Sequence, residues 1–391
     1  MSFIGRVAVI GAGVMGHGIA QVVATSGFSV SLVDVSEGIL ARATTSIKGS
    51  LEKLYEKGFL KEDPKSVLSR IETTTSLIKA VSGADYVIEA VPENLELKKN
   101  VFSQADKWAP PHAILATNTS TLRITEIAEA TMRPSKVLGM HFFNPPQLMK
   151  LVEIVKGERT GGDVVEVAKE LARRMGKEVV ICERDLPGFI VNRILFREIN
   201  EGLWALERGE ASEEQVDSSA RYSLGLPMGP VELSDFIGLD TVLSILKVLE
   251  EGYGRRFSPP PTLKALVEEG NLGRKSGRGF YDWSSGRPSI SKDLAGDFDS
   301  ARLLAVSANE AYWVVEDGVT IEEEVDRAMK LGANWPKGPF RWCQEVGKER
   351  VRSLLRDLAR RLVEEFFPLV GTPQYFFVKI IKKYLICDCQ M

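Results

Sequence analysis

The chain has 391 residues, a length that suits two or three domains rather than one. Hydrophobic residues make up 44% of it and charged residues 26%, which is typical of a globular protein and excludes a disordered chain, a collagen-like repeat and a disulfide scaffold. The formal charge of −3, from 50 basic and 53 acidic residues, gives no electrostatic reason to expect a nucleic-acid partner.

Cysteine and histidine are too sparse for a metal centre. The chain has three histidines and four cysteines, namely Cys182, Cys343, Cys387 and Cys389. The cysteines lack metal-site spacing, so we expect no metal and a reducing, cytoplasmic compartment. Strand-like sequence from Arg6 onward leaves no room for a signal peptide. The apolar stretch 375–386 is too short and too rich in lysine to span a bilayer, so we expect no membrane partner.

The first part of the chain alternates short apolar runs with helical stretches, a pattern typical of a parallel sheet covered by helices on both faces. Strands are predicted at residues 7–10, 29–34, 86–90, 114–117, 137–140, 150–155 and 178–182. A helix is predicted over 163–175. After Pro187-Gly188 strand signals become sparse and helical periodicity dominates, so we place a domain boundary near residue 186.

The helical part contains an internal repeat with an offset of 109 residues. Asn200-Glu201-Gly202 recurs as Asn309-Glu310-Ala311, and Asp217 recurs as Asp326. Pro227-Met228-Gly229-Pro230 recurs as Pro336-Lys337-Gly338-Pro339. One offset that holds across separate matches predicts two tandem all-α helical domains, at 187–285 and 298–370. The tail, 371–391, has no assigned role.

A glycine-rich turn follows the first strand and opens a helix. Its sequence, Gly11-Ala12-Gly13-Val14-Met15-Gly16, matches G-x-G-x-x-G. Gly11 permits the tight turn, Gly13 lets backbone N–H groups approach a pyrophosphate, and Gly16 lets the helix pack on the strand. Asp34 ends the next strand, where a carboxylate binds a ribose 2′-hydroxyl and repels a 2′-phosphate. The pattern predicts an α/β Rossmann-type NAD-binding domain over 1–186; the alternative is a glycine-rich turn without a ligand.

His141 and Glu153 are candidates for a catalytic pair. His141 follows a predicted strand, and ligands bind at the C-terminal ends of strands in open α/β sheets. A strand–loop–strand excursion could bring the Glu153 carboxylate back to the imidazole. The pair suits alcohol oxidation, because hydride leaves carbon only as the hydroxyl proton is removed, and imidazole is a suitable base near neutral pH. The alternative is a structural histidine in an aromatic segment.

Four further motifs resemble those of the L-3-hydroxyacyl-CoA dehydrogenase family. In chain order they are Asn118-Thr119-Ser120-Thr121-Leu122, His141-Phe142-Phe143-Asn144-Pro145, Met149-Lys150-Leu151-Val152-Glu153 and Pro187-Gly188-Phe189-Ile190-Val191-Asn192-Arg193. The resemblance covers residues from about 5 to about 282, and the second helical copy extends it to about 370. It implies NAD-dependent oxidation of a 3-hydroxyacyl-CoA to a 3-oxoacyl-CoA.

The resemblance also implies catalytic roles for individual residues. His141 matches the general base and Glu153 its carboxylate partner. Ser120 matches the serine that hydrogen-bonds the 3-oxygen of the substrate, and Asn192 matches the asparagine that holds the reacting oxygen with His141. The site is then expected in a cleft between domains. Taken alone, without the resemblance, Ser120 and Asn192 would be interpreted as an N-cap serine and a helix-start asparagine rather than as functional residues.

Further matches concern the cofactor and coenzyme A. Glu93, Lys98, Asn118 and Ser120 match cofactor-facing positions, beside the glycine-rich turn and Asp34. Ser50, Lys57 and Asn144 match positions that contact the coenzyme A substrate. Ser50 and Lys57 lie seven residues apart, or two helical turns, so both can face the same way. A solvated, charged helix is the open alternative for these two residues.

The second helical copy departs from the family pattern. The position 109 residues after Asn192 is Ala301, and no Pro-Gly-Phe precedes it. We therefore expect one active site that uses the first copy, with the second copy as a built-in partner, in a monomer or homodimer. The chain has no room for a hydratase domain, so we expect no hydratase activity. The alternatives are a non-catalytic relative and a β-hydroxyacid dehydrogenase with a lysine base.

Overall fold

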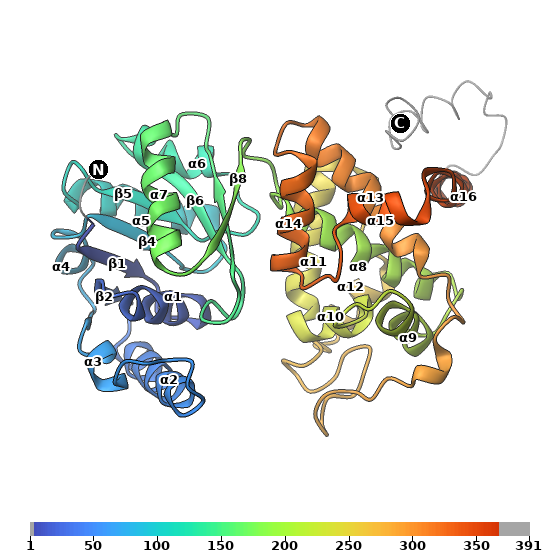
Figure 1. The fold of residues 1–391 in the computed structure, drawn as a ribbon, viewed down its shortest axis with the longest axis horizontal. Coiled ribbons are helices and arrows are strands. Elements are labelled where there is room, and N and C mark those ends of the chain that lie inside the picture. Colours follow the sequence, from blue (N-terminus) through green and yellow to red (C-terminus); the bar gives the residue numbers. More distant parts are fainter. Residues whose placement is uncertain (1–3, 367–391) are drawn as a thin grey trace. The chain divides into compact units, whose positions relative to one another are not determined.

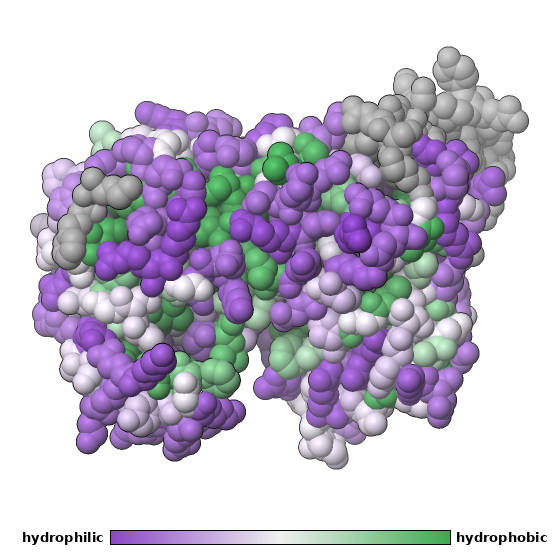
Figure 2. All heavy atoms as spheres, viewed as in Figure 1, coloured by the Kyte–Doolittle hydropathy of each residue, from purple (hydrophilic) through white to green (hydrophobic). Residues whose placement is uncertain are grey.

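The computed structural model describes residues 4–366 and divides into two compact units after Phe189 (Figure 1). The first unit is a sheet with surrounding helices, and the second is helical. The predicted tail, 371–391, lies outside the described residues. No helix within residues 4–366 is long and apolar enough to cross a membrane. On the face drawn in Figure 2, hydrophilic residues prevail over hydrophobic ones.

The sheet of the first unit has eight strands in the order β3-β2-β1-β4-β5-β6-β7-β8. The strands are β1 (Arg6–Ile10), β2 (Ser29–Val33), β3 (Ile71–Thr74), β4 (Tyr86–Glu89), β5 (Ile114–Thr117), β6 (Val137–Phe142), β7 (Leu151–Val155) and β8 (Glu178–Cys182). The helices are α1 (Val14–Thr25), α2 (Glu37–Glu56), α3 (Pro64–Leu68), α4 (Leu77–Val81), α5 (Leu95–Trp108), α6 (Ile124–Ala128) and α7 (Gly162–Arg174). The central strands are apolar and buried, as expected when helices cover a parallel sheet.

Two features of the sheet differ from the sequence prediction. β6 and β7 pair antiparallel, whereas every other neighbouring pair is parallel. The connection 143–150 carries no helix that could return the chain for a parallel strand, so the chain reverses directly. β3 was not predicted, because its sequence, Ile-Glu-Thr-Thr, forms a partly exposed edge strand without a hydrophobic run.

The second unit repeats one helical arrangement twice. The first copy contains α8 (Val191–Glu207), α9 (Glu213–Ser223), α10 (Pro230–Ile237), α11 (Leu239–Tyr253) and α12 (Pro261–Glu268). The second copy contains α13 (Ala301–Glu316), α14 (Glu322–Gly332), α15 (Pro339–Val346) and α16 (Lys348–Phe366). The helices α8 to α11 thus correspond to α13 to α16. Both copies lie within one compact unit, because α8 packs against α13.

Local contacts repeat at the same offset. Asp217 accepts hydrogen bonds from the backbone N–H groups at the start of α10, at 2.9 and 2.7 Å. Asp326 does the same at the start of α15, at 2.8 and 2.9 Å. Glycine precedes both helices, and a Cβ atom at Gly229 or Gly338 would lie 2.2 Å from the aspartate side chain. The repeat seen in the sequence is therefore a repeat of helix-capping geometry.

Two buried ion pairs cross between the copies in a reciprocal manner. The Arg193 guanidinium in α8 donates from Nε to Glu310 Oε1 in α13 at 2.6 Å. Arg302, which is offset from Arg193 by 109, donates from Nη2 to Glu201 Oε1 in α8, also at 2.6 Å. Contacts that exchange in this way define a self-complementary interface, as between two identical subunits. The two copies therefore pack as a pseudo-twofold pair.

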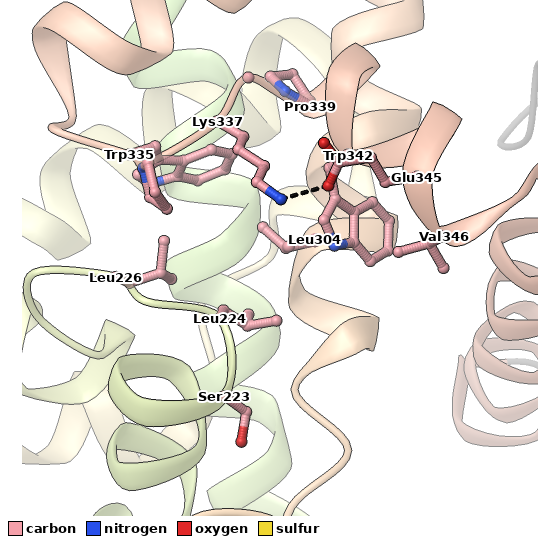
Figure 3. Close-up of a pocket in the computed structure, with 12 residues that line it drawn as sticks. Ser223, Leu224, Leu226, Leu304, Trp335, Lys337, Pro339, Trp342, Glu345 and Val346 are labelled. Carbon is pink, nitrogen blue, oxygen red and sulfur yellow. Dashed lines mark hydrogen bonds and ion pairs between the residues drawn. The ribbon is translucent and has the colours of Figure 1, made fainter.

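A cavity of about 240 Å³ lies beside this packing (Figure 3). Leu224 and Leu226 of the first copy line one side, and Trp335 and Trp342 of the second copy line the other. An ion pair joins Lys337 and Glu345 at its border. None of the residues predicted for the active site lines this cavity.

Candidate active site

The glycine-rich turn between β1 and α1 has the geometry expected of a dinucleotide site. Gly11 has a positive φ of 96°, and a Cβ atom there would lie 2.7 Å from the Ala90 carbonyl oxygen. A Cβ atom at Gly16 would lie 1.7 Å from the Gly11 carbonyl oxygen, so helix and turn meet without space between them. Gly13 differs, because nothing lies within 4 Å of the Cβ position there.

The open space at Gly13 lies at the N-terminus of α1, where Gly13 is the N-cap residue. Val14, the first helical residue, is 66% exposed, whereas Met15 packs against the hydrophobic core. Asp34 follows β2, and its Oδ2 accepts a hydrogen bond from Ala12 N at 2.8 Å. The open space at the N-terminus of α1 suits a pyrophosphate, and the Asp34 carboxylate beside the turn suits a ribose. The residues present therefore fit NAD.

His141 and Glu153 lie opposite each other on β6 and β7. They are register partners, and His141 Nδ1 lies 2.7 Å from Glu153 Oε2. Glu153 is fully buried and His141 is 6% exposed. The rings of Phe143 and Phe189 lie 4.5 and 5.8 Å from the imidazole centroid to centroid. The carboxylate therefore fixes the imidazole, and Nε2 is the nitrogen that can exchange a proton with a substrate.

The position of His141 corrects one detail of the sequence prediction. β6 extends to Phe142, so His141 lies within the strand rather than after it. Because the strands are antiparallel, the carboxylate that faces His141 comes from the directly opposite residue. The excursion of the chain between the two residues was predicted, whereas the antiparallel register was not.

Asn118 and Ser120 lie on the loop that follows β5. The Asn118 Oδ1 atom accepts a hydrogen bond from Phe142 N at 2.8 Å, which links this loop to the end of β6. Ser120 donates from its backbone N–H to Glu93 Oε1 at 2.9 Å, and its hydroxyl lies 3.3 Å from the same oxygen. The predicted cofactor residues Asn118, Ser120 and Glu93 are thus brought together at the carboxyl ends of β4 and β5.

Lys98 departs from the prediction that it faces the cofactor. Its side chain is only 1% exposed, and its ammonium group lies 2.7 Å from Glu89 Oε1 and 3.4 Å from Glu93 Oε2. Its Nζ also donates to the Val91 carbonyl oxygen at 3.2 Å. Of these three charged side chains only Glu93 is exposed, so Lys98 can influence a bound cofactor only through its contact with Glu93.

The residues predicted to contact coenzyme A lie at three places. Ser50 is half-buried within α2, and Lys57 is exposed and is the C-cap residue of the same helix, where its backbone N–H still donates to the Lys53 carbonyl oxygen at 3.2 Å. The helix ends at Glu56, one residue before Lys57. Asn144 is exposed on the connection between β6 and β7, two residues after β6 ends.

Asn192 belongs to the second unit and is the second residue of α8. The corresponding helix of the second copy, α13, begins at Ala301, the residue offset from Asn192 by 109. The first turn of α8 therefore offers an amide side chain where α13 offers a methyl group.

Two buried residues of this region carry no motif and were not predicted. Glu89, at the end of β4, is fully buried and contacts Lys98. Lys177 is 8% exposed, and its Nζ donates to the carbonyl oxygens of Pro146 and Met149 at 2.5 and 2.7 Å. Burial lowers the pKa of Lys177 to about 8. Lys177 thereby secures the connection that carries Asn144.

The fold and the His–Glu pair together define a dinucleotide-dependent dehydrogenase of the Rossmann type. Residues 6–186 match the family model described as "3-hydroxyacyl-CoA dehydrogenase, NAD binding domain". Residues 188–283 and 298–380 both match "3-hydroxyacyl-CoA dehydrogenase, C-terminal domain". The chain belongs to the 3-hydroxyacyl-CoA dehydrogenase family. Its cofactor is NAD.

Some relatives match about 70% of this chain, and others match nearly all of it. A probable 3-hydroxybutyryl-CoA dehydrogenase of Deinococcus radiodurans is 45% identical over 276 residues, which cover 70% of this chain and 99% of that protein. A 3-hydroxyadipyl-CoA dehydrogenase of Escherichia coli is 34% identical, over 92% of this chain and 94% of the relative. The crystal structure of an Escherichia coli 3-hydroxybutyryl-CoA dehydrogenase superposes with a TM-score of 0.85 at 32% identity, covering 97% of this chain and 100% of that one.

Proposed function

We propose that this chain catalyses the reversible, NAD-dependent oxidation of an (S)-3-hydroxyacyl-CoA to a 3-oxoacyl-CoA. The observation that carries the proposal is the buried contact of 2.7 Å between His141 and Glu153. The printed names of the relatives, which include 3-hydroxybutyryl-CoA dehydrogenases of bacteria, support the same substrate class.

In this mechanism NAD, held at the glycine-rich turn and Asp34, would supply the hydride acceptor for C3 of the substrate. His141 removes the hydroxyl proton at Nε2, while Nδ1 stays bonded to Glu153. The carboxylate holds the ring in one tautomer and stabilises the imidazolium that forms. Phe143 and Phe189 restrict the access of water to the ring, which strengthens the attraction between imidazolium and carboxylate. In the reverse direction His141 returns the proton to the oxygen.

We assign Ser120 and Asn192 to the 3-oxygen of the substrate, because a hydroxyl and an amide can donate to a ketone and also accept from an alcohol. We assign the cofactor to the glycine-rich turn, Asp34, Glu93 and Asn118, with Lys98 behind Glu93. For coenzyme A we assign Ser50, Lys57 and Asn144, since their exposed or half-exposed polar groups suit phosphate and amide groups.

The second helical copy serves, in this proposal, as a built-in partner of the first. The reciprocal ion pairs of Arg193 and Arg302 support this role. We infer one active site and one NAD per chain, in a monomer or a homodimer, which sedimentation would distinguish. We also infer a cytoplasmic location, in keeping with the few and scattered cysteines of the sequence.

The deciding experiment measures NADH oxidation with acetoacetyl-CoA, beside free acetoacetate and beside NADPH. We expect rapid turnover only with the thioester and NADH, because Asp34 disfavours a 2′-phosphate. Turnover with free acetoacetate would favour a β-hydroxyacid dehydrogenase. Binding of NADH without turnover would favour a non-catalytic relative. Hydration of crotonyl-CoA by the pure protein would reveal a second activity.

A further inference from the structure

A buried carboxylate that the proposed mechanism does not use lies at the end of β4. Glu89 is fully buried and has three donors around it. Its Oε1 accepts from Val91 N at 2.6 Å and lies 2.7 Å from Lys98 Nζ, and its Oε2 accepts from the Thr117 hydroxyl at 2.7 Å. A buried carboxylate with this many donors is held in one geometry. Burial nevertheless raises the pKa of Glu89, against the attraction of Lys98.

Lys98 lies between two carboxylates at unequal distances. Its Nζ is 2.7 Å from Glu89 and 3.4 Å from Glu93. A buried ammonium group must be neutralised closely, because the loss of hydration outweighs any distant attraction. The short contact therefore makes Glu89 the principal counter-charge of Lys98, and Glu93 a secondary one.

Glu93 binds the loop that carries Ser120 through Oε1, the carboxylate oxygen that does not contact Lys98. Its Oε1 accepts from the Thr119 hydroxyl at 2.6 Å, from Ser120 N at 2.9 Å and from Thr121 N at 3.2 Å. Burial opposes the ionisation of Glu93, but the Lys98 charge and these donors outweigh it, so the pKa of Glu93 lies below its ordinary value. An anionic Glu93 is thus the acceptor that shapes this loop.

These contacts form a connected series from Glu89 through Lys98 and Glu93 to Ser120. We propose that Glu89 is a positioning residue for Ser120: by neutralising Lys98, it leaves Glu93 in place to hold the loop. Without the Glu89 charge, Lys98 would have Glu93 as its remaining carboxylate partner and would draw it away from Thr119 and Ser120. This inference rests on the proposed function only in that Ser120 contacts the substrate.

The test is Glu89→Gln, which keeps the shape of the side chain and removes its charge. We expect kcat with acetoacetyl-CoA to fall about tenfold or more and the backbone amides of residues 118–122 to exchange hydrogen for deuterium faster than in the wild type. Asp106→Asn is the matched control, because Asp106 is another buried acid of this unit, lies on α5, and pairs with Arg133 rather than with the Ser120 loop. It should lower the melting temperature and leave both readouts unchanged.

A second substitution separates positioning from mere structural damage. Adding Lys98→Met to Glu89→Gln removes the cation that pulls on Glu93, so amide exchange of 118–122 should return toward the wild-type rate. Faster exchange in the double variant than in Glu89→Gln would overturn the proposal. The proposal would also be overturned if Glu89→Gln had the same kinetics and the same exchange rates as Asp106→Asn. Should Glu89→Gln not fold, the double variant carries the test, with slow exchange expected.

The two proposals fail in different ways. An inactive wild type would refute the proposed function, whereas amide exchange would still decide whether Glu89 positions the loop. An active wild type together with unchanged exchange and unchanged kcat in Glu89→Gln would refute the positioning role alone.

Discussion

His141 owes its pairing to strand register, because β6 and β7 place it directly opposite Glu153. We predict that His141→Gln lowers turnover of acetoacetyl-CoA by roughly 10²- to 10⁴-fold, the usual contribution of a positioned base. Affinity for NADH should barely change, because the residues assigned to the dinucleotide follow β1, β2, β4 and β5, whereas His141 lies on β6. Steady-state kinetics and fluorescence titration with NADH measure the two effects. Turnover that survives the substitution would remove His141 from the mechanism.

Gly13 and Gly16 belong to one motif but should respond differently to substitution. Gly13→Val adds a side chain in open space, in a backbone conformation that other residues adopt, so we expect stability to be kept and NADH binding to be lost. Gly16→Ala places a Cβ atom 1.7 Å from the Gly11 carbonyl oxygen, so we expect a large loss of stability. Thermal melting and NADH titration of both variants check this contrast. Tight NADH binding by Gly13→Val would contradict the assigned site.

Single residues were predictable where a motif dictates the chemistry. The glycines, Asp34, His141 and Glu153 were identified in this way from their spacing and strand context. Glu89 and Lys177 were not, since a lone carboxylate or lysine in the sequence gives no sign of burial. The same holds for Lys98: the resemblance indicated that it belongs to the cofactor site, but not that its ammonium group is buried behind Glu93.

At the scale of elements, seven of the eight strands were predicted, and the polar edge strand β3 was not. β1, β4 and β5 are short apolar runs, which the sequence predicts directly. β3 is a polar strand at the edge of the sheet, where one side is open to solvent. Its sequence has no hydrophobic run, so only its pairing with β2 identifies it as a strand. The antiparallel β6–β7 pair follows from the short connection between the two strands. The sequence predicted both strands but not their relative direction.

Helices α8 and α9 each bury an acid, Glu198 and Asp217, which makes the stability of this unit dependent on pH. Burial and then Asp217 raise the pKa of Glu198 to about 8. Burial raises the pKa of Asp217 to about 7, although Tyr281 and two backbone N–H groups donate to it. Between the ordinary carboxyl range and these values, the folded protein holds protons that the unfolded chain has released. The free energy of unfolding therefore falls as the pH rises from about 5 to about 8.

We predict that Glu198→Gln flattens this dependence. At pH 8.5 the variant should be more stable than the wild type by about 1 to 3 kcal/mol, and the two should converge near pH 5, where Glu198 is protonated. Urea denaturation at a series of pH values measures this, with the exposed Glu251→Gln as a control that should keep the slope of the wild type. A Glu198→Gln variant that loses stability at pH 8.5 would show that the carboxylate is stabilised rather than strained.

At the scale of the whole molecule, the repeat was readable because capping residues and turns recur at one offset. The sequence also predicted that the second copy acts as a partner of the first, but it did not reveal which residues pair across their contact. Arg193 and Arg302 look like ordinary helix residues, and only the packing of α8 on α13 turns them into reciprocal partners of Glu310 and Glu201. Partner choice across an interface depends on three-dimensional placement, which the spacing of residues along one chain does not specify.

The packing of α8 on α13 leads to a prediction about how the second unit unfolds. Glu310 is fully buried, and Arg193 and Arg256 outweigh the burial that opposes its ionisation, so its pKa is lowered. Glu310→Gln leaves the fully buried Arg193 without its closest counter-charge, which costs about 3–5 kcal/mol. Because the pair crosses between copies, both copies should unfold together in one transition at lower urea concentration, followed by tryptophan fluorescence and circular dichroism.

Glu201→Gln should have a matching effect, since Glu201 neutralises Arg302 from the opposite side of the same pseudo-twofold interface. The exposed Glu323→Gln on α14 is the control and should leave the transition in place. If Glu310→Gln instead produced two separate transitions, with only the second copy destabilised, the copies would be independent domains joined in sequence. A single shifted transition for both Glu310→Gln and Glu201→Gln would mean that the second copy is an integral part of the fold on which the first copy depends.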